Sequence, residues 1–355
     1  MNAAPTLLVV IPCLNEEAHL ADLLDHLCAD PSAAHARIVV ADGGSTDRSA
    51  EIVSARAAKD ARIVLLPNPK RLQSAGVNLA VEHFCADADA FFRIDAHAGY
   101  PELFLTRLLS VYRESGADSV TVSMRAVAHA NSCLQHAAAC AQNSVLGAGG
   151  SPHRKGGGRR WVEHGHHALF KTSSFRAVGG YDESFSHNED AEFDIRLAAN
   201  GGKILLAADI LIDYFPRTNA RALAAQYFKF GQGRACTVRK HRTPLRPRQL
   251  APVLIAPTIL MATLTPFSPW WALPMTIWLG ICGLYGVLLG LRAKNLCACG
   301  SGIAAMIMHA GWSVGFLLQI AAPSSTPQTS PGPPISRPSA SHTIKASVST
   351  DQDNP

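Results

Sequence analysis

The 355-residue chain is 48% hydrophobic and 17% charged with a formal net charge of +5, so its core can fill one large domain or two ordinary ones. Nine basic residues and no acidic residue lie between Arg217 and Arg248, whereas 19 basic and 25 acidic residues precede Arg217. The nine cysteines form no CxxC pair, and Cys297 with Cys299 is too small a cluster for a metal site, so we expect reduced thiols in a cytosolic domain.

Strand and helix patterns alternate through about the first hundred residues. Short apolar runs predict four strands, at residues 6–11, 38–41, 62–66 and 90–97. Apolar residues at helical spacing between them predict three helices, the first capped by Asn15 and the third over 72–84. This alternation is typical of a doubly wound α/β nucleotide-binding half. No GxGxxG follows any of these strands and no GxxxxGK(S/T) occurs, which argues against a dehydrogenase and a P-loop enzyme.

Asp42 stands where the second predicted strand ends, in the segment IVVADGGSTD. Gly43 and Gly44 after it allow a sharp turn and a close approach of the backbone. Ligands of open α/β sheets bind beyond the carboxyl ends of the strands, so Asp42 points to a ligand site. A capped turn without a ligand explains the same residues. The recurrence of strand, turn and helix upstream and downstream favours the ligand site.

A glycine-rich, basic segment at residues 147–160 predicts a loop that folds over a diphosphate, or a flexible solvated loop. His164, His166 and His167 follow it, but no further ligand stands at the spacing of a zinc site, so we do not expect zinc.

A helix with acidic first turns is predicted from HNEDAEFDIRLAANGG, capped by Asn188 and ended by Gly201. Acidic residues at a helix N-terminus are favoured by the helix dipole and need no function. Two adjacent carboxylates, Glu189 and Asp190, beside a nucleotide-binding half would nonetheless suit general-base catalysis.

The basic segment from Arg217 to Arg248 favours either nucleic acid or an anionic membrane surface. Leu223, Tyr227 and Phe230 recur in it at helical spacing, which predicts an interfacial helix within residues 217–250. An apolar stretch follows directly, so we expect a membrane partner and no nucleic acid.

No charged residue occurs in the 41 residues from Ala251 to Leu291, about twice the roughly 20 that cross a bilayer. The stretch predicts a hairpin of two spans, with a third at 302–322, although its prolines leave a re-entrant or peripheral helix pair open. Arg292 and Lys294 lie on the same side as the basic segment, which places the N-terminal domain in the cytosol. The Ser- and Pro-rich residues 323–355 predict a disordered tail.

Six motifs, in order, resemble glycosyltransferase family 2, and most closely its ExoA-type succinoglycan glucosyltransferases. They are VVIPCLNEE, VVADGGSTD, NPKRLQSAGVNLA, RIDAHAGYP, GGYDESFSHNEDAEFDIRLAANGG and QYFKFGQGRACTVRKH. The resemblance spans about residues 5–260 and implies a GT-A fold over residues 1–216, with the membrane region at 251–322. It also implies an inverting transfer of a sugar, glucose in the ExoA type, from a UDP-sugar to a polyprenyl-diphosphate-linked glycan at the bacterial inner membrane.

Site residues follow from the same resemblance. Asp42 would contact the uracil or ribose of the donor, and the other donor-binding residues would be Pro12, Asn15, Glu17 and Asp95. Asp190 would be the catalytic base, with Glu189 beside it in the catalytic pair.

The family's Asp-x-Asp metal motif reads Asp95, Ala96, His97 here, as in the ExoA-type branch. Asp95 and His97 would therefore hold the divalent metal, Mn²⁺ or Mg²⁺, with nitrogen favouring Mn²⁺. Lys229 and Arg234 are candidates for the acceptor's diphosphate.

Two other classes of protein share part of this pattern. A processive polysaccharide synthase would need more spans and a Q-x-x-R-W motif, but Gln226 to Arg234 read QYFKFGQGR without tryptophan. A non-catalytic membrane scaffold with a degenerate GT-A fold would be suggested by loss of Asp42, Asp95 or Asp190. All three are present, which favours the enzyme.

Overall fold

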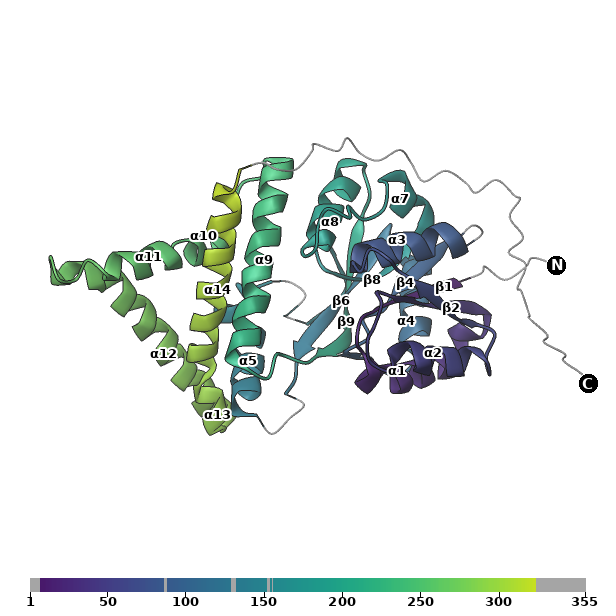
Figure 1. Ribbon diagram of the computed structural model, residues 1–355, viewed down its shortest axis with the longest axis horizontal. Coiled ribbons are helices and arrows are strands. Elements are labelled where there is room, and N and C mark those ends of the chain that lie inside the picture. Colours follow the sequence, from purple (N-terminus) through teal and green to yellow (C-terminus); the bar gives the residue numbers. More distant parts are fainter. Residues whose placement is uncertain (1–6, 86–87, 129–131, 152–153, 155, 324–355) are drawn as a thin grey trace, which may run out of the picture.

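A computed structural model describes residues 7–85, 88–128, 132–151, 154 and 156–323. Its sheet has the strand order β3-β2-β1-β4-β8-β6-β9-β5, with β7 beside β9 (Figure 1). The strands are β1 (Leu7–Cys13), β2 (Ala36–Asp42), β3 (Ile63–Pro67), β4 (Ala90–Arg93), β5 (Ala98–Gly99), β6 (Ser119–Ala126), β7 (Arg160–Val162), β8 (His166–Lys171) and β9 (Ile204–Tyr214). The helices that cover the sheet are α1 (Glu17–Ala29), η1 (Pro31–His35), α2 (Ser49–Ala57), α3 (Gln73–Phe84), α4 (Phe104–Ser115), α7 (Thr172–Ala177) and α8 (Glu189–Ala199).

The first four strands run parallel, as the alternating pattern predicts. They are nearly continuous apolar runs because helices cover both faces of the sheet. Side chains of α1, α2 and α4 share one core with Val9 and Ile11, and those of α3, α7 and α8 share another with Leu8 and Val10. The four predicted strands and three predicted helices are therefore present. The fourth strand ends at Arg93, earlier than predicted, because the chain then turns away toward Tyr100, whose hydroxyl accepts from Asp95 N–H at 2.8 Å.

A second helical layer packs beside the sheet and is built from distant parts of the chain (Figure 1). It contains α5 (Cys133–Asn143), α6 (Val145–Ala148), α9 (Ala220–His241), α10 (Pro247–Val253), α11 (Ile255–Ala262), η3 (Pro269–Ala272), α12 (Leu273–Ala293), α13 (Leu296–Cys299) and α14 (Ser301–Ala321). Helices α9 and α14 lie side by side because Gly231 meets the carbonyl of Trp312 and Gly315 meets that of Phe228, where a Cβ would clash. The apolar face of α9, with Leu223 fully buried, is covered by α5 and α14. Phe230, on the same predicted face, is 39% exposed, so the interfacial helix stays a prediction.

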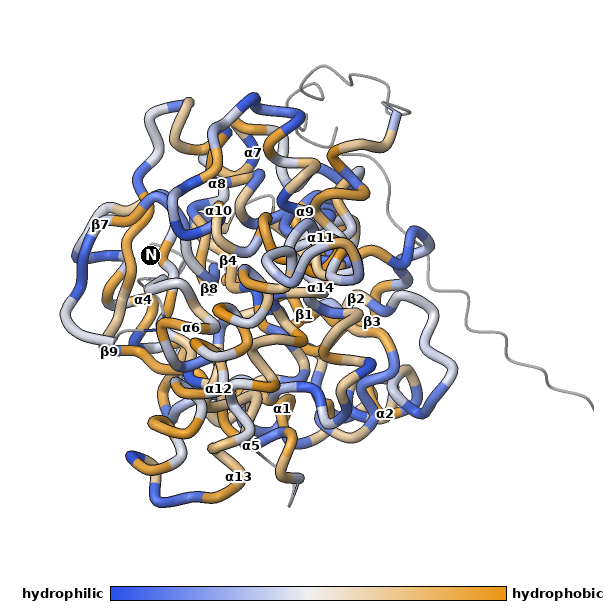
Figure 2. Tube along the Cα trace, turned by 90° about the vertical axis from the view of Figure 1, so that its left-hand side faces the viewer, coloured by the Kyte–Doolittle hydropathy of each residue, from blue (hydrophilic) through white to orange (hydrophobic). Residues whose placement is uncertain are grey.

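The apolar C-terminal region differs from the three predicted spans. Two helices in the described residues are long and apolar enough to cross a bilayer, within Pro269–Ala293 and Leu296–Ala321. The first predicted span is instead the short helices α10 and α11, of 7 and 8 residues. Pro252 and Pro257 each lack a donor N–H, which breaks up a longer helix here. In Figure 2 the α12 segment carries mainly hydrophobic colours, and its outer side chains, such as Leu284 and Leu291, are exposed.

A disulfide between Cys133 and Cys297 joins α5 to α13, so the expectation that all nine cysteines are reduced thiols is wrong for this pair. The two residues are 164 positions apart, and their approach depends on the packing of α13 on α5, which cysteine spacing does not reveal. The other seven cysteines are free. The predicted disordered tail lies outside the described residues, apart from its first residue, Pro323.

Candidate active site

The turns after β1 and β2 are cross-braced at the carboxyl edge of the sheet. The amide oxygen of Asn15 accepts from the N–H of Thr46 at 2.7 Å, and the carboxylate of Glu17 accepts from the N–H of Arg48 at 3.0 Å. Asn15 therefore does not cap α1, although its position in the sequence predicted that it would. Its backbone φ of 58° turns its side chain toward the neighbouring turn, and Glu16 occupies the N-cap position without a side-chain bond.

Asp42 ends β2 opposite Cys13 of β1, with Pro12 one pair earlier. Its carboxylate accepts from the N–H of Gly44 at 3.1 Å, and Gly44 has a φ of 79°, which few residues other than glycine adopt. The structure thus brings Pro12, Asn15, Glu17 and Asp42 to one edge and holds the Asp42 carboxylate in a fixed orientation, while their part in donor binding stays a prediction.

Arg93, at the end of β4, joins the two carboxylates Asp95 and Asp190. Its side chain is 5% exposed, forms an ion pair with Asp190 and lies 3.3 Å from Asp95 Oδ1. It also donates to the hydroxyl of Tyr181 at 3.1 Å, which itself donates to Asp190 Oδ1 at 2.7 Å. Asp95 and Asp190, 95 positions apart along the chain, therefore share one buried cation.

Glu189 and Asp190 differ in proton affinity although they are adjacent. Burial favours the neutral form of Asp190, but the charges of Arg93, His167 and His166 outweigh it and hold the pKa of Asp190 below its ordinary value. Burial and the neighbouring Asp190 raise the pKa of Glu189 to about 7. Asp190 is therefore ionised at neutral pH, whereas a large fraction of Glu189 is protonated.

The two residues of the predicted metal pair have different partners. His97 Nδ1 lies 2.8 Å from Glu16 Oε1, whereas His166 Nε2 lies 3.4 Å from Asp95 Oδ2. Among the residues that the structure describes, no group of three or more His, Cys, Asp and Glu is placed to hold a metal ion. A carboxylate and an imidazole at this separation fit an ion whose other ligands are phosphate oxygens and water. The residues therefore fit a metal that a bound diphosphate helps to hold.

The neighbouring histidines anchor α8, the helix that carries Asp190. His164 Nδ1 and His167 Nε2 each lie 2.6 Å from a different oxygen of Asp194, one helical turn after Asp190. Ser119 Oγ lies 2.6 Å from His167 Nδ1. His166 faces Asp95 instead, so the three histidines diverge and do not converge on one ion.

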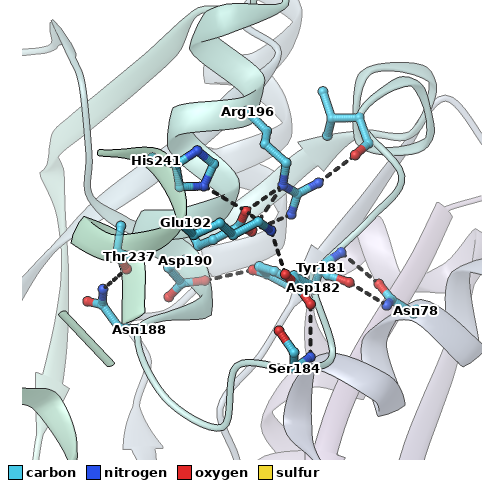
Figure 3. A network of polar contacts seen from close by, with 12 residues as sticks. Asn78, Tyr181, Asp182, Ser184, Asn188, Asp190, Glu192, Arg196, Thr237 and His241 are labelled. Carbon is cyan, nitrogen blue, oxygen red and sulfur yellow. Dashed lines mark hydrogen bonds and ion pairs between the residues drawn. The ribbon is translucent and has the colours of Figure 1, made fainter. Parts of the chain in front are cut away.

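Glu192 connects α8 to the end of α9 (Figure 3). Its carboxylate is fully buried and contacts Arg196 at 2.6 Å, Lys240 at 2.6 Å and His241 at 3.0 Å. Asn188, which has a φ of 67° and makes no cap bond, donates instead to Thr237 Oγ1 of α9 at 2.8 Å. The helix that carries Asp190 is thus fixed to the basic helix of the second layer.

The two candidate acceptor residues of α9 lie in different surroundings. Lys229 is exposed, and its charge together with burial lowers the pKa of His187. Burial and the charges of Arg246 and Arg248 lower the pKa of Arg234, which places Arg234 beside α10. The structure does not bring Lys229 and Arg234 together as one site.

Only part of the glycine-rich segment 147–160 is a loop in the described residues. It begins within α6 and ends at β7, and Arg159 forms an ion pair with Glu114 at 2.7 Å. Lys155 of this segment lies outside the described residues.

Arg93 and Tyr181 are site residues that sequence reasoning missed, and His166 was weighed only as a zinc ligand and not as a partner of Asp95. Arg93 stands in the apolar run AFFR, and a charge in an otherwise buried strand is a signal that could have identified it. Tyr181 gave no such signal, because its role depends on its contacts with Arg93 of β4 and Asp190 of α8.

Comparison with known proteins decides the family. The model of "Glycosyl transferase family 2" matches residues 8–179, which include Asp42 and Asp95. "Succinoglycan biosynthesis protein ExoA" of Rhizobium meliloti (strain 1021) is 46% identical over 310 residues, covering 87% of this chain and 93% of that protein. The chain belongs to glycosyltransferase family 2. Within this family it is an ExoA-type glycosyltransferase.

Two other proteins match this glycosyltransferase at lower sequence identity. A Methanococcus voltae protein named "Dolichyl N-acetyl-alpha-D-glucosaminyl phosphate 3-beta-D-2,3-diacetamido-2,3-dideoxy-beta-D-glucuronosyltransferase" is 23% identical over 244 residues, 65% of this chain and 74% of its own. The structure of "Mannosyltransferase PcManGT from Pyrobaculum calidifontis in complex with GDP-Man and Mn2+" superposes with a TM-score of 0.56 at 18% identity, covering 90% of this chain and 88% of that one. The fold is therefore GT-A, as the resemblance implied.

Proposed function

We propose that this glycosyltransferase transfers glucose, with inversion, from UDP-glucose to a polyprenyl-diphosphate-linked glycan in exopolysaccharide biosynthesis. The observation that carries the proposal is the buried bridge from Asp95 through Arg93 to Asp190. It brings together the carboxylate proposed to bind the donor and the carboxylate proposed to activate the acceptor. The name of the Rhizobium relative supports the pathway, and the dolichyl substrate in the name of the Methanococcus relative supports a lipid-linked acceptor.

The donor nucleotide would lie at the carboxyl edge of β1 and β2. Pro12, Asn15 and Glu17 would line its pocket, and Asp42 would accept hydrogen bonds from the uracil or ribose. The Asp42 carboxylate already accepts from the N–H of Gly44 and from the N–H and hydroxyl of Ser45, so the nucleotide would replace or share one of these contacts.

Asp190 would remove the proton from the acceptor hydroxyl. Arg93 and Tyr181 both contact Oδ1, so Oδ2 is the oxygen that would receive the proton. The acceptor oxygen then attacks the anomeric carbon in line with the departing diphosphate, which inverts that carbon and turns an α-linked donor into a β-glycoside. Glu189, buried beside it, is the second candidate for the base.

Asp95, with His97 or His166, would hold a Mn²⁺ or Mg²⁺ ion that stabilises the negative charge developing on the leaving UDP. The Pyrobaculum mannosyltransferase, whose structure is a complex with GDP-Man and Mn²⁺, supports a divalent metal. The distance from Asp95 to His166 supports a site that uses nitrogen as well as oxygen.

Asp95→Ala should abolish the metal-dependent part of UDP affinity, because the carboxylate that anchors the ion is lost. Mn²⁺ should support activity at least as well as Mg²⁺, since imidazole is a better ligand for Mn²⁺. Titration of UDP by calorimetry with Mn²⁺, Mg²⁺ or excess EDTA measures the metal dependence of binding, and transfer assays with each ion measure that of activity. Asp89→Ala, an exposed acid at the edge of β4, is the matched control and should bind UDP normally. Full activity in excess EDTA would remove the metal from the mechanism.

We further propose that the protein sits at the bacterial inner membrane with its catalytic domain in the cytosol. The exposed apolar side chains of α12 support a membrane partner, and Arg292 and Lys294 at its end support the cytosolic orientation. Lys229 and Arg234 of α9 remain our candidates for contact with the acceptor, each by itself because the structure does not bring them together as one site.

The experiment that tests this function is transfer from a panel of radiolabelled UDP-sugars to a lipid-linked acceptor extract by the purified protein. We expect UDP-glucose to give lipid-extractable label. Label from none of the donors would contradict the proposed function.

A further inference from the structure

A cavity of about 430 Å³ lies between β7 and the start of α10, away from the donor edge of the sheet. Its lining residues come from these two segments and are Arg160, Trp161, Val162, Glu163, His164, Arg246 and Arg248. None of the residues predicted for donor binding or catalysis lines it. The cavity is thus a second recess next to the site already described.

The charges around this cavity are unbalanced. Arg246 forms an ion pair with Glu163, whose side chain is 81% exposed, and Glu163 is the only acid in the lining. Arg234 lies beside Arg246 and Arg248, and its Nε is buried without a hydrogen-bond partner in the described part of the chain. Like charges at short range repel, and a buried donor without a partner costs free energy. An anion bound in the cavity would relieve the repulsion among the arginines that line it.

The cavity adjoins the catalytic helix on one side and the apolar region on the other. His164 lines it and contacts Asp194, one helical turn from Asp190. Arg248 lies on α10, and the next residues outward, Leu250 and Leu254, are 50% and 60% exposed. An anion bound in the cavity would therefore lie between the helix that carries Asp190 and the exposed apolar side chains of Leu250 and Leu254.

We propose that this cavity binds the diphosphate of the lipid-linked acceptor, with Arg246 and Arg248 as its main contacts. A guanidinium group can bind two phosphate oxygens at once. Two arginines therefore suit the several oxygens of a diphosphate better than those of a single carboxylate. Leu250 and Leu254 give the first isoprene units an apolar path toward the bilayer. The inference rests on the proposed function for the identity of the lipid, and on the cavity's own charges for its chemistry.

The test measures binding to the full-length protein in detergent with saturating UDP present, so that the donor site is filled. Farnesyl diphosphate and inorganic pyrophosphate are titrated separately by calorimetry. We expect farnesyl diphosphate to bind more tightly than pyrophosphate. The double variant Arg246→Ala/Arg248→Ala should weaken the binding of both by at least about tenfold, which corresponds to about 1.4 kcal/mol. UDP affinity should be unchanged.

Three variants separate recognition from a structural role. Arg221→Ala, an exposed arginine in the first turn of α9, should bind both ligands normally. Glu163→Gln should bind them as well as or better than wild type, because it removes the acid that competes for Arg246. Arg246→Lys/Arg248→Lys, which keeps the charge and the fold, should retain part of the affinity.

Equal affinity of the wild type and the double alanine variant would overturn the proposal. Binding of pyrophosphate but not of farnesyl diphosphate would also overturn it, since the site would then take free phosphates only. These measurements need no sugar transfer. Arginine-dependent binding in a protein that transfers no sugar would therefore contradict the proposed function alone.

Discussion

Asp190→Asn should lower the rate of sugar transfer by about 10²- to 10⁴-fold, the usual contribution of a general base, while UDP affinity stays nearly unchanged. Asparagine has the size of aspartate, and its oxygen can still accept from Arg93 and Tyr181 in place of Oδ1. It cannot take a proton from the acceptor. Single-turnover transfer and UDP titration on the same preparation measure the two effects separately.

Glu189→Gln is the matched control and should retain much more activity than Asp190→Asn. The pH profile separates the two carboxylates further. Because the pKa of Asp190 is held below its ordinary value, it stays ionised as the pH falls from about 8 to about 6, and transfer should not fall with it. A base with the pKa of Glu189, about 7, would become protonated over this range and activity would drop. Equal residual activity of the two variants, or poor UDP binding by Asp190→Asn, would show that the base is assigned wrongly.

Glu192→Ala should destabilise the protein by about 3 kcal/mol, the lower end of the cost of breaking a buried ion pair. The change leaves Arg196, Lys240 and His241 without their shared carboxylate, which is fully buried. Lys240 is 33% exposed and can reach water, which limits the loss. Denaturant unfolding followed by fluorescence measures the change in the free energy of unfolding.

Glu51→Ala gives the comparison for this second prediction. Glu51 pairs with Arg48 on the surface, where both side chains are about 70% exposed, and such pairs contribute about 0–1 kcal/mol. A loss in Glu192→Ala no greater than in Glu51→Ala would mean that the contact between α8 and α9 does not stabilise the fold. A normal stability with reduced transfer would instead assign Glu192 to positioning Asp190.

The parallel half of the sheet could be predicted from sequence because its signals are local. Apolar runs followed by turn residues and amphipathic helices determine β1 to β4, and Asp42 and Asp95 follow from their places at strand ends. Asp190 was accessible through a motif at a helix start. These features depend on residues within one turn or strand of each other.

Long-range packing accounts for what sequence reasoning missed. Arg93 reaches Asp190 only because β4 lies against α8, and the disulfide forms only because α13 packs on α5. Residues 302–322 have the hydropathy of a membrane span, yet α14 packs along α9 because glycines let the two backbones approach closely. Hydropathy alone does not report such a partner.

The most direct test of the central claim is the configuration of the bond that the enzyme makes. Purified protein is incubated with UDP-α-glucose and the lipid-linked acceptor, and the new glycosidic linkage is assigned by NMR coupling constants of the anomeric proton. In-line attack assisted by Asp190 predicts a β-linked glucose. An α-linked product, or release of free glucose without transfer to the lipid, would contradict an inverting glycosyltransferase.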